Sequence, residues 1–313
     1  MDLQPVPWPP GARSATVTLG GDRVRLLDLG GPEDAPVVLC VHGLGASAIT
    51  FGLVGPLLAG RHRVLAVDLL AHGGSAVGAD AAAGNRRLIG RVVESVVGTP
   101  VVLVGQSMGG VLAIQHAAEA PDTVRRLVLI GPPVPRPTRL PVDPILAARR
   151  AFLRLPPVER AVAARLRRMT PEEAVDAQVR QATPHVDRVP ADVLPVMVAE
   201  TRERAARPDA AAAQAAQWRA ITGTMAVLVH ARRFRETVAR ISAPTLYLQG
   251  EDDPLAPVAA ARALAATRPD WRLEVFPGVG HVPHVEDPQG TADRVLRWLA
   301  EPVARQAGGT PRT

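Results

Sequence analysis

The residues best suited to covalent chemistry lie in the stretch Gly105–Gly109, which has the pattern G-x-S-x-G around Ser107. An apolar, β-branched run at 101–104 predicts a buried strand before it, and the residues from Met108 to Ala120 predict a helix after it. Glycines permit such a tight turn, which would lift the serine hydroxyl off the sheet edge as a nucleophile. The same pattern also occurs in ordinary turns with a solvent-facing serine, so the rest of the chain must decide between the two.

A serine hydroxyl becomes a nucleophile at neutral pH when a base accepts its proton and a carboxylate orients that base. The base we expect is His281, in the glycine-rich loop that follows a predicted strand at 272–276. A loop in that place emerges at the carboxyl edge of a parallel sheet, the edge that would also carry Ser107. His284 is the alternative base, although we expect it to face solvent or a neighbouring segment.

The acid we expect is Asp253, which follows a predicted strand at 245–248. It belongs to a run of three acids, Glu251 to Asp253, and such a run also suits a solvated turn. Asp252 is the alternative acid. The order serine, aspartate, histidine along the chain is typical of a nucleophile held on this kind of strand-to-helix turn.

Attack on a carbonyl creates an oxyanion, which needs hydrogen-bond donors. We expect the backbone N–H groups of Met108 and Leu44 to supply them, because Leu44 lies between two glycines in the loop after a predicted strand at 37–41. His42 and His72 are expected to support the backbone and carry no proton in the reaction. The histidines are dispersed and no metal-binding or dinucleotide-binding motif occurs, so no metal and no cofactor is predicted.

These residues must be positioned by elements that alternate along the chain. A hairpin is predicted at 15–19 and 23–29, followed by strands joined by helices, which is typical of a mostly parallel sheet flanked by helices. The expected strands are 37–41, 63–67, 101–104, 126–130, 245–248 and 272–276, and the expected helices are 46–58, 86–97, 108–120, 258–266 and 291–300.

Between the two halves of this pattern the chain is helical. Thr170 and Glu173 form a capping-box pattern at the start of one helix. Further helices are expected at 145–155, 158–168, 191–206 and 210–221. We therefore predict a core domain from 1–131 and 241–304, a helical lid domain at 132–240, and a disordered tail at 305–313.

Composition narrows the function classes. The chain has 313 residues and a net charge of +6, with arginine as its only basic residue apart from histidine. The arginines are scattered along the chain with glutamates among them, and aromatic residues make up only 3%, so a nucleic-acid partner is not expected. The start of the chain resembles no secretion signal, and no apolar run reaches the ~20 residues that span a bilayer. We expect a cytoplasmic protein without stable membrane insertion, whose single cysteine, Cys40, packs in the core.

Taken together, the motifs resemble those of the α/β-hydrolase superfamily, and in the family's order. The resemblance implies an α/β-hydrolase fold with an inserted lid, the triad Ser107, Asp253 and His281, and a small-molecule acyl substrate. Leu70-Ala71 stands where Pro-Gly is usual, and Gln106 where histidine or asparagine is common. The matching segments are His42–Gly45, Asp68–Ser75, Gly105–Gly110, Gly250–Pro257, and Gly280-His281 with Glu286 and Pro288.

The resemblance leaves several activities open. Hydrolysis of a carboxylic ester is the function we predict. Carbon–carbon bond hydrolysis or acyl transfer with the same triad, or a non-catalytic ligand-binding role, are the alternatives. Apolar residues of the insertion would either line a substrate pocket or form the lid's own core: Leu194, Met197, Val198, Trp218, Met225 and Leu228.

Overall fold

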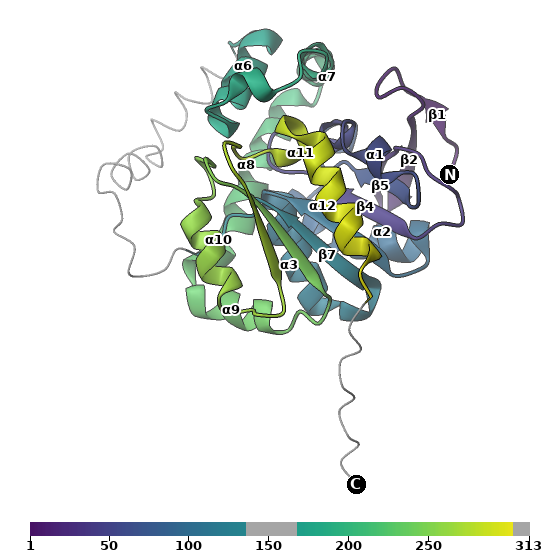
Figure 1. Ribbon diagram of the computed structural model, residues 1–313. Helices are drawn as coiled ribbons and strands as arrows, with labels where there is room; N and C mark the ends of the chain where they lie inside the picture. The colour runs from purple at the N-terminus through teal and green to yellow at the C-terminus, as the bar shows by residue number, and fades with distance from the viewer. Residues whose placement is uncertain (136–167, 303–313) are drawn as a thin grey trace.

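A nine-stranded sheet forms the centre of the computed structural model, which describes residues 1–135 and 168–302 (Figure 1). The strand order is β1-β2-β3-β5-β4-β6-β7-β8-β9. Helices cover both faces of the sheet, so the predicted α/β architecture is confirmed. The helices expected at 145–155 and 158–168 fall outside the described residues, apart from the last position of the second, and so does the expected tail at 305–313.

The first edge of the sheet is antiparallel, as predicted. Strands β2 (Arg13–Leu19) and β3 (Asp22–Asp28) form a hairpin, and β1 (Gln4–Pro5) extends it. Gly20 and Gly21 turn the hairpin with φ angles of 59° and 89°, a left-handed conformation that glycine adopts without a steric cost.

The remaining six strands are mutually parallel. Their carboxyl ends therefore meet at one edge, and the loops that follow four of them carry the residues predicted to do chemistry. The strands are β4 (Val37–Val41), β5 (Arg63–Val67), β6 (Val101–Gln106), β7 (Val124–Ile130), β8 (Thr245–Gly250) and β9 (Arg272–Phe276).

Side chains alternate between the two faces of the sheet and fill two cores. In β4, Leu39 and Val41 belong to one core, against α2 (Ala81–Val92) and α3 (Met108–Glu119). Val38 and Cys40 belong to the other core, which α12 (Pro288–Ala300) helps to cover. Alternation with both faces buried explains why the strand is a continuous apolar run in the sequence.

The predicted helix at 46–58 is wrong as a single element. The structure has a 3₁₀ turn, Ala48–Phe51, followed by the short helix α1 (Gly55–Leu58). Pro56 has no N–H for a continuous helical ladder. Gly52 also lies so close to the ring of Trp8 that a Cβ there would be 1.9 Å from it, so a larger residue would have to displace that ring.

Several helices begin elsewhere than predicted. Asp80 caps α2 by accepting hydrogen bonds from the N–H groups of Ala82 and Ala83, which places its start five residues before the predicted one. Asp287 likewise caps α12 three residues early. The short helix α11 (Pro283–Glu286) was not predicted, and α10 spans Val258–Ala265.

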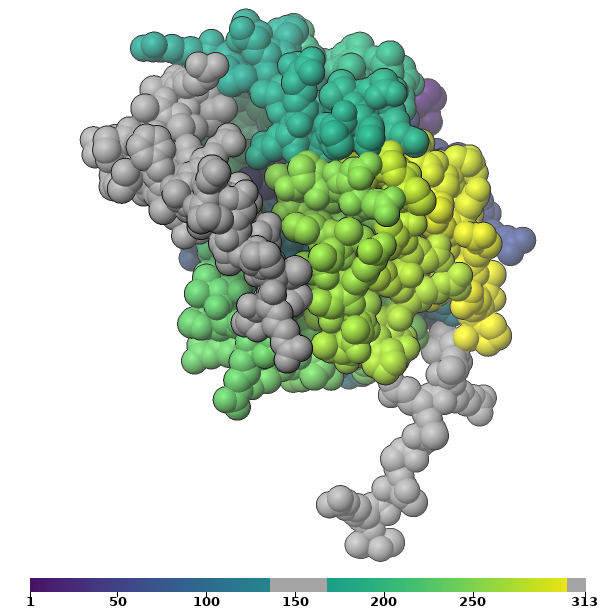
Figure 2. Space-filling model, turned by 60° about the vertical axis from the view of Figure 1, so that its left-hand side comes forward, coloured from purple at the N-terminus to yellow at the C-terminus, as the bar shows by residue number. Residues whose placement is uncertain are grey.

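The described part of the insertion holds α6 (Pro171–Ala182), α7 (Val193–Ala206), α8 (Ala210–Ala226) and α9 (Ala231–Ala239). The capping box of Thr170 and Glu173 is confirmed. Helices α6 and α7 lie above the carboxyl ends of the strands, directly on the yellow-green part of the chain (Figures 1 and 2). They contribute Val175, Val179 and Val193 to a small apolar cluster that also includes Val285 of α11.

Helices α8 and α9 are arranged differently. They bury Ala216, Ala220, Phe234 and Val238 in the same core as α2 and α3. The helices of the insertion are therefore not equivalent, since two of them cover the strand ends and two extend the central core. A domain boundary enclosing all of 132–240 stays a prediction.

Candidate active site

Ser107 occupies a strained turn between β6 and α3. Its φ of 52° lies in the left-handed region, which costs a residue with a Cβ about 1–3 kcal/mol. A Cβ at Gly105 would lie 2.6 Å from the Gly109 carbonyl oxygen, and one at Gly109 would lie 2.3 Å from that of Val41. Both glycines are thus required by close backbone approach, and Ser107 keeps partial exposure between buried neighbours.

His281 and Asp253 lie together. The Nδ1 atom of His281 is 2.8 Å from Oδ2 of Asp253, and both residues are buried. The other carboxylate oxygen, Oδ1, accepts hydrogen bonds from the backbone N–H groups of Leu255 and Ala256, each at 2.8 Å. The arrangement fixes the carboxylate and directs the Nδ1–H of the imidazole toward it, which leaves Nε2 free to act as a base.

The alternative residues have other surroundings. Asp252 is exposed and pairs with Nε2 of His185 at 2.7 Å. His284 is buried with its ring 5.1 Å from that of Phe51, and neither ring nitrogen has a hydrogen-bond partner among the described residues. Burial, followed by the proximity of His281, lowers the pKa of His284 to about 3, so its imidazole is neutral.

The loop after β4 lies against Ser107. A Cβ at Gly43 would lie 2.9 Å from that of Ser107 and 2.5 Å from the side-chain oxygen of Gln106. Gly45 has a φ of 71°, which lets the loop turn beside Leu44. Met108 is the first residue of α3, so the positive end of the helix dipole is directed at the same place.

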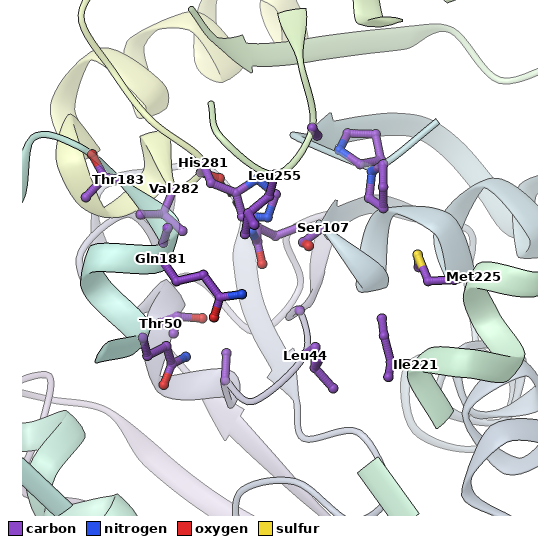
Figure 3. A pocket seen from close by; sticks show the side chains of 18 of the residues that line it. Leu44, Thr50, Ser107, Gln181, Thr183, Ile221, Met225, Leu255, His281 and Val282 are labelled. Carbon is purple, nitrogen blue, oxygen red and sulfur yellow. Dashed lines mark hydrogen bonds between the residues drawn. The ribbon is translucent and has the colours of Figure 1, made fainter. Parts of the chain in front are cut away.

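A cavity of about 960 Å³ lies beneath α6 and α7. Ser107, His281 and Leu44 face it from the sheet edge, and the Gln181 side chain extends into it from α6 (Figure 3). Four of the six apolar residues expected at a pocket do line it, namely Met197, Trp218, Met225 and Leu228. Leu194 and Val198 pack instead against the small cluster under α6 and α7.

The chain matches the model of the alpha/beta hydrolase family over residues 38–294. It belongs to the alpha/beta hydrolase family. An uncharacterized protein of Mycobacterium tuberculosis is 31% identical over 277 residues, covering 84% of this chain and 75% of that protein. Protein phosphatase methylesterase 1 of Rattus norvegicus is 34% identical over 130 residues, 37% of this chain and 33% of its own. The structure of Cfl2 from Burkholderia cenocepacia superimposes with a TM-score of 0.75 at 22% identity, covering 95% and 98% of the two chains.

The supporting histidines of this hydrolase contact the backbone, as expected. The Nδ1 atom of His42 lies 2.7 Å from the carbonyl oxygen of Gly43. On the other side of the ring, the N–H of Leu69 donates to Nε2 at 3.0 Å. His72 Nδ1 lies 3.0 Å from the Leu70 carbonyl. Burial lowers the pKa of His42 to about 4 and that of His72 to about 3, so both are neutral at physiological pH.

Two polar residues that hold the site in this hydrolase were not singled out from the sequence. Gln249 donates to Oδ2 of Asp253 at 2.8 Å. Glu286, buried in α11, accepts from the N–H of Gly280 at 2.8 Å and from the Thr183 hydroxyl at 2.6 Å. Glu286 lies in a segment that carries the family resemblance, which was the available signal for it.

Neither a metal site nor a membrane span is found in the described ranges. No three histidine, cysteine, aspartate or glutamate residues there come close enough together to hold a metal ion. Among the described helices, none has the length and apolar character needed to cross a bilayer.

Proposed function

We propose that this hydrolase cleaves carboxylic esters of small, apolar acyl groups through an acyl-enzyme. The observation that carries the proposal is the buried His281–Asp253 pair, whose His281 lines the same cavity as the strained Ser107. Serine, histidine and aspartate in this relation activate a hydroxyl for attack on a carbonyl.

In the proposed reaction, the Ser107 hydroxyl attacks the ester carbonyl while Nε2 of His281 accepts its proton. Asp253 stabilises the imidazolium that forms, and the N–H groups of Met108 and Leu44 donate hydrogen bonds to the oxyanion. His281 then protonates the departing alkoxide, leaving the acyl group on Ser107. Water, deprotonated by His281, attacks the acyl-enzyme and releases the acid.

The cavity lining supports an apolar acyl group. Met197, Ile221, Met225 and Val193 supply alkyl and thioether surface, with a few polar groups that could orient an ester, among them Gln181. The chain is also similar, over 130 residues, to a rat protein whose name describes it as a methylesterase, an enzyme that hydrolyses esters.

Hydrolysis of p-nitrophenyl butyrate and octanoate tests the proposal. We expect Ser107→Ala to lower kcat/KM by about 10³-fold or more, because only oxyanion stabilisation and binding remain. Ser95→Ala, at an exposed position on the π-helical turn after α2, is the matched control. Activity of Ser107→Ala within tenfold of the parent would refute the proposal. Product analysis with methanol present distinguishes hydrolysis from acyl transfer.

A further inference from the structure

Three charged side chains form a buried cluster beside the active site. Asp68, after β5, is fully buried, and Nε of Arg25 on β3 donates to its Oδ2 at 2.5 Å. Another guanidinium nitrogen of Arg25 donates to Glu200 of α7 at 2.5 Å. None of the three lines the cavity, and the proposed reaction uses none of them.

Arg25 and Asp68 hold each other in their charged forms. Burial alone would lower the pKa of Arg25, but the Asp68 and Glu200 carboxylates raise it. Burial alone would raise the pKa of Asp68, yet Arg25 keeps it below its ordinary value. Well-packed apolar residues often give equal or greater stability than such a buried cluster, so stability alone is a weak reason for it.

Three further bonds of this cluster and of α7 are made to one loop, in addition to the bond that the N–H of Gly74 donates to Oδ2 of Asp68 at 2.7 Å. The second carboxylate oxygen of Glu200 accepts from the Ser47 hydroxyl, and Oδ1 of Asp68 accepts from the N–H of Ala48 at 2.8 Å. One turn further along α7, Arg204 donates to the carbonyl of Gly45 at 3.1 Å. The loop that carries Leu44 is therefore held at three nearby points, two of them by α7.

We propose that Glu200 and Arg204 are positioning residues, which hold the loop 43–48 so that the Leu44 N–H is directed at the oxyanion. The inference rests on the proposed function, because it assigns the loop its role in that reaction. An oxyanion donor acts on the transition state more than on the bound substrate. Losing its support should therefore lower kcat and leave KM nearly unchanged.

The test compares Glu200→Gln and Arg204→Met with Glu203→Gln, a matched control at an exposed position of the same helix. We expect each of the first two to lower kcat for p-nitrophenyl butyrate by about tenfold, with KM within twofold. Complete loss of one oxyanion donor lowers kcat by about 10²–10³-fold, and a misplaced donor should lose part of that effect. An alkylboronic acid, which forms a tetrahedral adduct, should bind more weakly by the same factor. Glu203→Gln should match the parent.

A double-variant cycle tests the path through Ser47. If Glu200 acts through this hydroxyl, Ser47→Ala lowers kcat similarly, and the double variant Ser47→Ala/Glu200→Gln is little worse than either single variant. An unchanged kcat in Glu200→Gln and Arg204→Met, an effect confined to KM, or additive losses would overturn the proposal.

Hydrogen exchange separates this proposal from the proposed function. Exchange of the backbone amides at 43–48 should rise in Glu200→Gln and Arg204→Met, but not in Glu203→Gln, whatever reaction the protein catalyses. Arg204→Met leaves the ion cluster intact, so it keeps the test valid if Glu200→Gln fails to fold. Unchanged exchange in the folded variants would contradict the positioning role. Ester hydrolysis by Ser107→Ala at the rate of the parent would instead contradict the proposed function.

Discussion

At the scale of single residues, the carboxylate of Asp253 is fully engaged. Oδ1 accepts two backbone N–H groups, and Oδ2 accepts from Gln249 and from His281. The position after β8 was enough to find this part of the chain from the sequence. The family pattern supported the choice of Asp253 over Asp252, because neighbouring acids in a loop have no periodicity that separates buried from exposed. The structure separates them by environment.

Asparagine substitutions at these two positions should have very different effects. In Asp253→Asn an amide replaces the carboxylate and no longer holds His281 in the tautomer with hydrogen on Nδ1. The kcat should therefore fall by about 10³–10⁴-fold. Asp252→Asn loses only an exposed contact to His185 and should stay within threefold of the parent, as an exposed pair contributes little. The measurement is steady-state ester hydrolysis, and equal losses in the two variants would show that Asp253 has no special role.

Gly280 and Ala71 illustrate what residue patterns leave hidden. A Cβ at Gly280 would lie 2.6 Å from the Thr183 hydroxyl, a contact between segments almost 100 residues apart. Ala71, at a position where the family usually has glycine, does adopt a left-handed φ of 67°. The departure from the family pattern was visible in the sequence, but the strain that accompanies it was not.

At the scale of elements, α6 is tied to the loop of the proposed base. The N–H of His281 donates to the Ala182 carbonyl at the end of α6 at 2.8 Å. Thr183, the next residue, donates to Glu286, which also binds the N–H groups of Gly280 and Val282. Helices α6 and α7 thus contact two different loops of the site, one on each side of Ser107.

Thr183→Val tests this connection while preserving the shape of the side chain. It removes a buried donor to Glu286, so the free energy of unfolding should fall by about 1–3 kcal/mol. Thr222→Val, at an exposed position of α8, is the control and should change stability by less than about 0.5 kcal/mol. Urea unfolding measures both, and equal stability of Thr183→Val and the parent would contradict the connection.

Apolar patterns predicted the strands better than the helices. The strands β4 to β7 each contain a buried apolar run, at 37–41, 64–67, 101–104 and 127–130. In the region 46–58, buried Phe51, Val54 and Leu58 have helical spacing, although the backbone is a 3₁₀ turn and a short helix. The spacing correctly indicated which side chains are buried, but it did not indicate that the backbone is divided into two short elements.

At the scale of the whole molecule, the parallel strands and their shared edge followed from strand–helix alternation, since parallel strands need crossover helices. The cluster of Arg25, Asp68 and Glu200 did not follow. Its members come from a hairpin, a loop and a helix that meet only after folding, and nothing in the sequence of α7 distinguishes buried Glu200 from exposed Glu203. Ion pairs between segments so far apart in the chain can be identified only from the folded structure.

Buried neutral histidines make stability depend on pH. His42, His72 and His284 have pKa values lowered by burial to about 4, 3 and 3, against about 6.5 in an unfolded chain. Below pH 6.5 the unfolded state therefore binds more protons, and stability falls as pH falls. Each histidine should reduce the free energy of unfolding by about 2 kcal/mol between pH 6.5 and 5.

Urea unfolding at pH 7, 6 and 5 checks this expectation. His284→Gln removes one of the three titrating groups and should have a shallower dependence on pH than the parent. A free energy of unfolding that is the same at pH 7 and pH 5 would contradict the neutral, buried state of these side chains.

Covalent labelling with a fluorophosphonate, read by mass spectrometry, tests most directly whether Ser107 is the nucleophile. We expect a single adduct, located on the peptide that contains Ser107, absent from Ser107→Ala and formed at least about a hundredfold more slowly in His281→Ala, which lacks the base. An adduct on another residue, labelling that persists in Ser107→Ala, or no labelling of the folded parent would contradict the assignment.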